Sequence, residues 1–188
     1  MVVLDIETLN SADDCRICGH EEADHRSIAS RCRAYQSFGW ADHAALGIFI
    51  GCYYDGVDDQ YHFFDQHTLL ATMRDFLVRP GLCLVTYNGW TFDLPLMRTV
   101  AGEALSDDEA VEWGGLAGKD YDILDQIWQV DSANKFTKGN GLDAVSQANG
   151  YGAKAMTGAM APRLWAQGRY AEVIAYCLAD VWKTRQLY

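Results

Sequence analysis

VVLDIET, residues 2–8, is a β-branched run that predicts a strand near the start of the 188-residue chain. Successive side chains of a strand point to opposite faces, so Asp5 and Glu7 share one face and apolar residues take the other. Two buried, unpaired carboxylates would be costly, and a divalent cation held between them would compensate for that cost. The alternative is an edge strand that leaves both acids in solvent.

The remainder of the chain has the hydrophobic pattern of a mixed α/β protein. Short apolar runs predict further strands at 44–54, 60–65 and 82–87. Helical spacing and helix-start signals predict helices at 69–77, 122–130, 141–148 and 170–188, and another that opens at 93–96. This order predicts the α/β class, with a mixed β-sheet flanked by helices. We expect one domain over residues 1–188, with 9–43 as an insertion after the first strand.

The charge balance excludes one way of binding nucleic acid. Lys plus Arg number 15 and Asp plus Glu number 26, which gives a net charge of −11. A protein that holds nucleic acid on a broad basic surface is not this acidic. Clustered carboxylates are compatible with such a charge, because they hold divalent cations that in turn meet the phosphates.

The sequence lacks the patterns of membrane and exported proteins, and this sets our expectation for the cell compartment and for the oxidation state of the cysteines. No apolar run approaches the ~20 residues of a transmembrane helix, and the N-terminus has no basic and apolar leader pattern. We therefore expect a cytoplasmic protein with no membrane partner. The 6 Cys are then expected to be reduced thiols or metal ligands.

Further acids occupy positions that suit a site. NGWTFD, residues 88–93, follows a predicted buried strand and brings Asp93 to the start of a helix, which is a common location for functional residues. A plain helix N-cap is the alternative for Asp93. Tyr176 and Asp180 are four residues apart on the last predicted helix and share one of its faces. Alternatively, the two residues lie at the boundary between the apolar and polar faces of an amphipathic helix and have no role in a site.

Together these residues resemble the three motifs of the DnaQ-like 3′–5′ exonucleases, which have the ribonuclease H-like fold. The matching patterns, in chain order, are Asp5-x-Glu7, Asn88-x3-Phe92-Asp93 and Tyr176-x3-Asp180. Tyrosine in the third motif matches the DEDDy subclass, since the histidine subclass has His at the position of Ala175. Residues 161–188 are similar to the end of stand-alone exonuclease domains related to the proofreading domains of family B polymerases. The resemblance covers residues 1–8 and roughly 45–188.

The resemblance implies phosphodiester hydrolysis with two Mg²⁺ or Mn²⁺ ions. It implies that Asp5 bridges both ions, that Glu7 and Asp180 hold the ion that activates water, and that Asp93 serves the second ion. Tyr176 would orient the attacking water. Asp122 matches a position where relatives often carry an acid, and a helix-start acid is the alternative for it.

The implied substrate is the 3′ end of single-stranded DNA, with RNA as the alternative. The alternative from another functional class is a protein that is not an enzyme. It would be a nucleic-acid-binding domain, or a domain that partners a polymerase or helicase. Trp90 and Phe92 are candidates for stacking a terminal base, although Phe92 also suits the core. Asn88 is a further substrate-binding candidate, and Lys138 could meet a phosphate from the loop at 135–141, which otherwise is an ordinary solvated loop.

The segment 9–43 carries a Cys/His pattern that departs from the family core. Its spacing is typical of a tetrahedral zinc site, with candidate ligands Cys15, Cys18, His25 and Cys32. His20 is a rival ligand, and a mobile loop with free thiols is the alternative. The segment also holds four arginines, which we hypothesise contact the substrate strand: Arg16, Arg26, Arg31 and Arg33.

Overall fold

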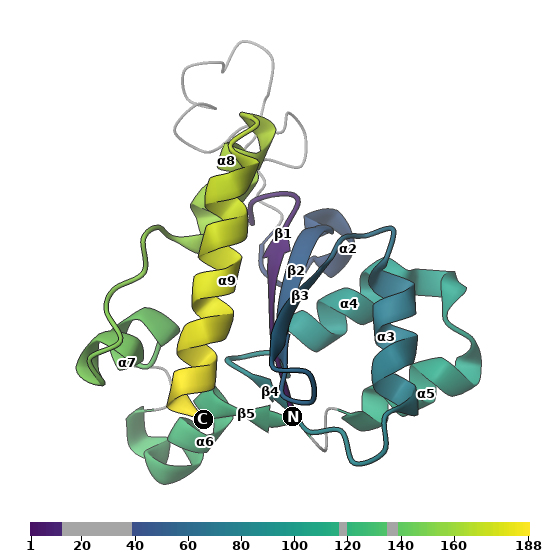
Figure 1. The fold of residues 1–188 in the computed structure, drawn as a ribbon, viewed down its shortest axis with the longest axis horizontal. Coiled ribbons are helices and arrows are strands. Elements are labelled where there is room, and N and C mark those ends of the chain that lie inside the picture. The colour runs from purple at the N-terminus through teal and green to yellow at the C-terminus, as the bar shows by residue number, and fades with distance from the viewer. Residues whose placement is uncertain (13–38, 117–119, 135–138) are drawn as a thin grey trace.

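The computed structural model describes residues 1–12, 39–116, 120–134 and 139–188 (Figure 1). In this part of the chain, five strands form one sheet in the order β3-β2-β1-β4-β5. The strands are β1 (Val2–Thr8), β2 (Ile48–Asp55), β3 (Gln60–Phe64), β4 (Leu84–Thr86) and β5 (Tyr121–Asp122). The pairs β1–β2 and β2–β3 are antiparallel, whereas β1–β4 and β4–β5 are parallel. The predicted fold class, a mixed sheet flanked by helices, is confirmed.

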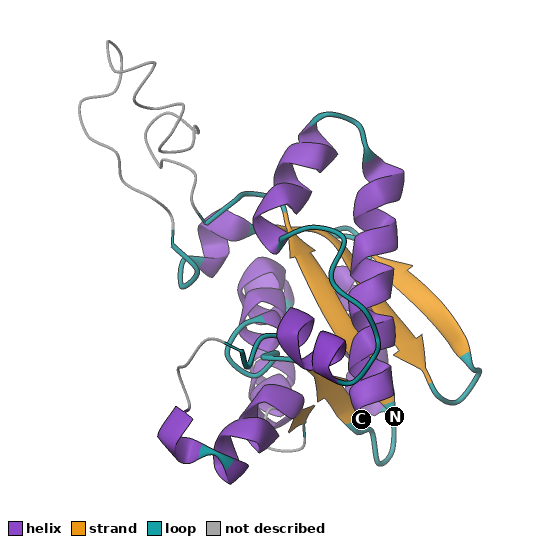
Figure 2. Ribbon diagram, turned by 90° about the vertical axis from the view of Figure 1, so that its left-hand side faces the viewer, coloured by secondary structure: helices purple, strands orange, loops and turns teal. Residues whose placement is uncertain are grey.

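Helices lie on both sides of the sheet (Figures 1 and 2). They are α2 (His43–Leu46), α3 (Leu69–Val78), α4 (Asp93–Ala101), α5 (Asp107–Leu116), α6 (Ile123–Val130), α7 (Leu142–Ala148), α8 (Ala161–Ala166) and α9 (Tyr170–Leu187). Three short 3₁₀ turns join them in the described part of the chain, at η1 (Gly102–Ala104), η2 (Ser132–Asn134) and η3 (Gly158–Met160). None of the described helices has the length and apolar character needed to cross a membrane.

The two faces of β1 enter different cores, as its alternating pattern predicts. Val2, Leu4 and Ile6 are buried in a cluster with side chains from α3, α4 and α5. Val3 is buried in a second cluster, with Cys177 and Val181 of α9. Because Asp5 and Glu7 lie on the same face as Val3, β1 presents both acids toward α9.

The predicted strand at 44–54 is wrong at its first residues. His43–Leu46 form α2 instead, because the Asp42 side chain accepts a hydrogen bond from the Ala45 amide at 3.2 Å and caps this helix. Gly47 then adopts φ 59°, which favours glycine, and the chain turns into β2 at Ile48. The helix α5 has no counterpart in the sequence prediction, since its run DDEAVEWGGL carries two glycines and a weak apolar period.

Gly51 lets the two long antiparallel strands pack against the core on the α3 side. It lies opposite Ile6 of β1 and Phe64 of β3. A Cβ atom at this position would lie 2.1 Å from the Phe64 ring. The absence of a side chain therefore allows the buried Phe64 ring to cover β2.

Candidate active site

The four acids and the tyrosine hydroxyl of the three sequence motifs meet in one small pocket. Asp5 and Glu7 come from β1, Asp93 from the first turn of α4, and Tyr176 and Asp180 from α9. The pocket has a volume of about 120 Å³. It lies where the carboxyl end of β1 meets α9 and the N-terminus of α4, so residues far apart in the sequence become neighbours (Figure 1).

Burial and mutual repulsion disfavour the charged form of these acids. Burial raises the pKa of both Asp5 and Glu7 well above the usual range, and the charge of Asp180 raises them further. Burial also raises the pKa of Asp93 to about 7, and the nearby charges of Asp122 and Asp120 add to the rise. The site is therefore electrostatically strained whenever no cation balances it.

Carboxylate oxygens in this pocket lack partners. Among the described residues, Oδ2 of Asp5 and Oδ1 of Asp180 are buried and accept no hydrogen bond. A buried carboxylate oxygen without a donor is costly. Hard divalent cations such as Mg²⁺ and Mn²⁺ prefer oxygen ligands of this type. The set Asp5, Glu7, Asp93 and Asp180 thus fits one or more divalent cations.

Cys177 lies directly beneath the acids. Its Sγ comes within 4.8 Å of carboxylate oxygens of Asp5 and Glu7, and it donates to the Asp5 carbonyl oxygen at 3.6 Å. Burial raises the pKa of this thiol well above its ordinary value. The thiol is therefore protonated and packs as a small buried side chain beside the two acids.

Lys154 is a pocket residue that the sequence reasoning missed. Its Nζ forms an ion pair with Oδ2 of Asp180 and donates to the Tyr176 hydroxyl oxygen at 3.1 Å. Its Nζ also lies 5.2 Å from the centre of the Tyr176 ring. Burial alone would lower the pKa of Lys154, but the carboxylates of Asp180 and Asp5 outweigh it and raise the pKa. Lys154 is therefore a positive charge inside the acid cluster.

Tertiary contacts fix the segment that carries Lys154. Its backbone amide donates to the Asp143 carboxylate, in the first turn of α7. Lys183, a buried residue of α9, donates from Nζ to the Ala153 carbonyl at 2.8 Å. No local sequence pattern announces either contact. Both hold Lys154 over the same helix that carries Asp180.

Asp122 holds the loop of the second motif. Its carboxylate accepts from the amides of Asn88, at 2.9 Å, and Trp90, at 3.1 Å. It also accepts from the Leu124 amide at 3.0 Å and so caps α6. Asp122 is thus a helix-start acid that also supports the site, because its carboxylate fixes the loop that leads to Asp93.

The loop itself has little freedom. Asn88 has φ 70°, and its side chain accepts from the Thr91 hydroxyl at 2.6 Å. A Cβ at Gly89 would lie 2.4 Å from the Thr86 side chain. This strained backbone is the conformation that places Asp93 at the start of α4.

The remaining predicted residues are placed in different ways. Phe92 lines the acidic pocket and packs against Trp40, with 5.7 Å between ring centres. Asn88 is absent from the lining of that pocket, and Trp90 lines a larger hollow together with residues of α4 and α5. Three groups of predicted residues lie outside the described residues. They are Lys138, the four arginines of the insertion, and the zinc candidates Cys15, Cys18, His20, His25 and Cys32.

A further carboxylate lies beyond Asp93. Asp120 accepts from the Thr86 hydroxyl at 2.9 Å, and its Oδ1 is buried with no hydrogen-bond partner among the described residues. Burial raises its pKa to about 7, and the charge of Asp122 contributes. Sequence reasoning did not single it out, because an acid before a two-residue strand is an ordinary loop residue.

The sheet places β1 between an antiparallel and a parallel neighbour, with acids toward its carboxyl end, and so defines a mixed α/β fold class. Residues 38–188 match the family model of the RNase_H superfamily. Because this match covers most of the chain, the protein belongs to the RNase H superfamily. Among curated proteins, none matches the sequence.

Solved structures show the same fold. One similar structure is the family B DNA polymerase from the hyperthermophilic archaeon Pyrobaculum calidifontis, with a TM-score of 0.55 and 14% sequence identity. The superposition covers 99% of this chain and 23% of the polymerase. The chain thus spans about a quarter of the length of that polymerase.

Proposed function

We propose that the protein is a metal-dependent 3′–5′ exonuclease of the DEDDy type that hydrolyses single-stranded DNA from its 3′ end. One observation carries the proposal. Four carboxylates and a tyrosine hydroxyl, from β1, α4 and α9, line one pocket, and two of its buried carboxylate oxygens have no donor among the residues that the structure describes. Membership of the RNase H superfamily supports hydrolysis of nucleic acid. The similar solved structure is a DNA polymerase, which favours DNA over RNA.

Asp5, Glu7, Asp93 and Asp180 would hold two Mg²⁺ or Mn²⁺ ions. Two such ions activate a water molecule and stabilise the charge on the leaving oxygen of a phosphodiester. The chain's own contribution is to gather the four carboxylates before substrate arrives. The Asp122 carboxylate fixes the loop that ends at Asp93, so the acids need little rearrangement on binding.

Tyr176 acts in the proposed reaction as a hydrogen-bonding group. Burial raises its pKa above the normal value, and the charges of Asp180, Glu7 and Asp5 raise it further, so the phenol keeps its proton at neutral pH. It therefore orients a water or a phosphate oxygen and does not serve as a base. Lys154 fixes the phenol oxygen at 3.1 Å and adds a positive charge where the phosphate would lie.

The size of the pocket sets how the substrate enters. A pocket of about 120 Å³ is small for a whole nucleotide, so we assign the phosphate to it. The base would then lie beside Phe92 and Trp40, two aromatic residues of its lining. This arrangement suits a strand end that can bend away from its neighbours, as single-stranded nucleic acid does.

The proposal is tested with a 5′-labelled single-stranded DNA oligomer, incubated with Mg²⁺ or Mn²⁺. The controls are EDTA and the Asp5→Ala variant. We expect a ladder that shortens from the 3′ end and that is absent from both controls. A matched RNA oligomer compares the two substrates. If DNA and RNA both stay intact under every metal condition, the proposal is wrong and a binding or partner domain is the better assignment.

A further inference from the structure

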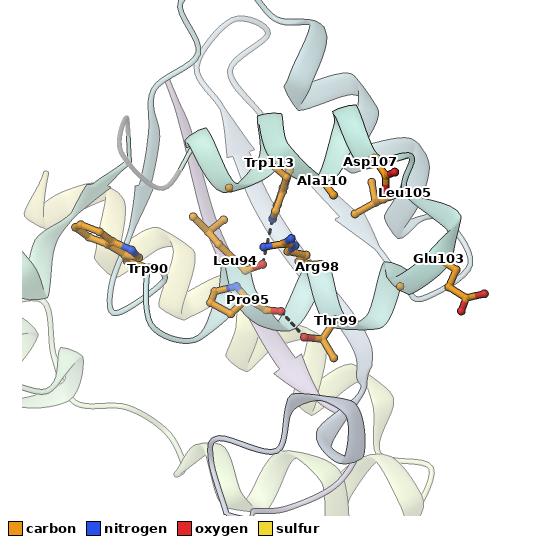
Figure 3. A pocket seen from close by; sticks show the side chains of 12 residues that line it. Trp90, Leu94, Pro95, Arg98, Thr99, Glu103, Leu105, Asp107, Ala110 and Trp113 are labelled. Carbon is orange, nitrogen blue, oxygen red and sulfur yellow. Dashed lines mark hydrogen bonds between the residues drawn. The ribbon is translucent and has the colours of Figure 1, made fainter.

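A hollow of about 640 Å³ lies between α4 and α5 (Figure 3). We call it the α4–α5 pocket. Its volume is in the range of pockets that bind small ligands. Its lining is mostly apolar and includes Leu94, Pro95, Leu105, Ala110 and Trp113. The chemistry described for the acidic pocket makes no use of it.

The cation in the lining is Arg98, which projects from α4 beside Trp113 (Figure 3). Within the part of the chain that the structure describes, its guanidinium has no hydrogen bond and no ion pair. The Arg98 side chain is exposed, so its charge is available to a ligand. A guanidinium in an apolar hollow matches the geometry and charge of a phosphate.

Trp90 offers an aromatic surface at one end of the α4–α5 pocket (Figure 3). Its side chain is 50% exposed, whereas Trp113 is buried and donates from its ring to the Leu94 carbonyl at 3.1 Å. The Trp90 backbone is fixed by its hydrogen bond to Asp122. Trp90 is thus a pre-positioned platform for a flat apolar group, such as a nucleobase.

The α4–α5 pocket adjoins the acidic pocket along the chain. Trp90 lines the first, and Phe92 and Asp93 line the second. Residues 90–93 therefore connect the lining of one pocket to the lining of the other. A strand held at the acids can place a neighbouring nucleotide in the α4–α5 pocket.

The opposite end of the α4–α5 pocket limits what it can accept. Glu103 and Asp107 lie there, away from Trp90 (Figure 3). Their charges repel further phosphates, so the pocket does not continue as a backbone track. It is suited to one nucleotide, with its phosphate on Arg98 and its base on Trp90.

We propose that the α4–α5 pocket binds one nucleotide of the substrate strand, next to the nucleotide whose phosphodiester lies at the acids. This inference rests on the proposed function and adds a second point of attachment to it. A basic peptide would meet Glu103 and Asp107 favourably but would bring positive charge onto Arg98. A nucleotide satisfies both Arg98 and Trp90.

The test measures KM against the length of the DNA. Oligothymidylates of two to eight nucleotides are degraded by the wild type, Trp90→Ala, Arg98→Ala and Arg185→Ala. Arg185→Ala is the matched control, because it removes the same charge from the last turn of α9, where Arg185 pairs with the exposed Asp59. We expect the wild-type and control KM to fall by about tenfold as the oligomer becomes long enough to fill the pocket. The two pocket variants should lose this dependence on length.

Binding is measured separately, by the fluorescence anisotropy of a labelled octathymidylate in EDTA. Weaker binding by Trp90→Ala and Arg98→Ala, but not by Arg185→Ala, supports the pocket even if the wild type cleaves nothing and the proposed function fails. The inference is overturned if both pocket variants keep wild-type binding and wild-type length dependence. Cleavage by all four proteins would then leave the exonuclease proposal intact.

Discussion

Replacing Asp93 by Asn should stabilise the protein while it destroys the proposed activity. Burial raises the pKa of Asp93 to about 7 in the folded chain, against an ordinary value of 3.8 in the unfolded chain. Between these two pH values the folded state binds more protons than the unfolded state. The free energy of unfolding therefore falls as the pH rises from about 4 to about 7, and it levels off above that.

The size of this loss follows from the difference in pKa. Each pH unit corresponds to about 1.4 kcal/mol, so ionising Asp93 costs the metal-free protein about 4 kcal/mol at pH 8. Asn has nearly the same shape and keeps an acceptor oxygen, but it carries no charge. We expect Asp93→Asn to raise the free energy of unfolding by about 4 kcal/mol at pH 8 and by less than about 1 kcal/mol at pH 4.

Urea unfolding in EDTA between pH 4 and pH 8, followed by tryptophan fluorescence, measures the effect. Asp108→Asn is the control, since it removes one charge from an exposed position of α5. Divalent cations should close the gap at pH 8, because they stabilise the wild type more than the variant. Curves of free energy against pH that run parallel for wild type and Asp93→Asn would refute the reasoning.

Three further substitutions probe the support of the site. Lys154→Ala leaves the buried Asp180 carboxylate without its cation, and it should cost about 3–5 kcal/mol in metal-free urea unfolding at pH 8 and slow DNA cleavage. Asp122→Ala frees the amides of the loop at 88–90, so it should lower the melting temperature and reduce kcat. Gly89→Ala places a Cβ 2.4 Å from buried Thr86 and should cost about 1–3 kcal/mol in urea unfolding.

Each of these substitutions has its own control or contrary result. Added Mn²⁺ should restore part of the stability lost in Lys154→Ala, and a variant as stable as wild type in EDTA would show that the ion pair is dispensable. For Asp122→Ala, an unchanged kcat would mean that the loop holds its shape without the carboxylate. Gly114→Ala is the control for Gly89→Ala, because a Cβ there meets nothing within 4 Å.

The sequence predicts well what depends on local period and spacing. Alternation along residues 2–8 placed Asp5 and Glu7 on one face of β1, and the four-residue spacing of Tyr176 and Asp180 placed both on one face of α9. Strand and helix periods alone were enough for the fold class. The structure agrees with these predictions because backbone geometry determines the face of a strand or helix on which a residue lies, in any tertiary context.

What the sequence conceals depends on contacts between distant segments. Lys154 stands in a loop without periodicity, and its position follows from Asp143 and Lys183. Asp122 shows a local cap signal, but its hold on the second motif requires the parallel pairing of β4 with β5. The apolar residues of the short helix α2 continue those of β2, so the sequence predicts strand for both, and only the Asp42 cap separates the two.

The contact between Cys177 and Asp5 joins residues 172 positions apart. A protein built on such distant contacts must close a long loop of chain before its core forms, and this slows folding. The distance in sequence between Asp5 and Cys177 also affects when the site can form during synthesis on the ribosome. The strand β1 is synthesised early, but α9, which supplies Tyr176 and Asp180, leaves the exit tunnel only after the rest of this sheet and its helices. Until α9 has been synthesised, the nascent chain lacks Tyr176 and Asp180, and the acid cluster is incomplete.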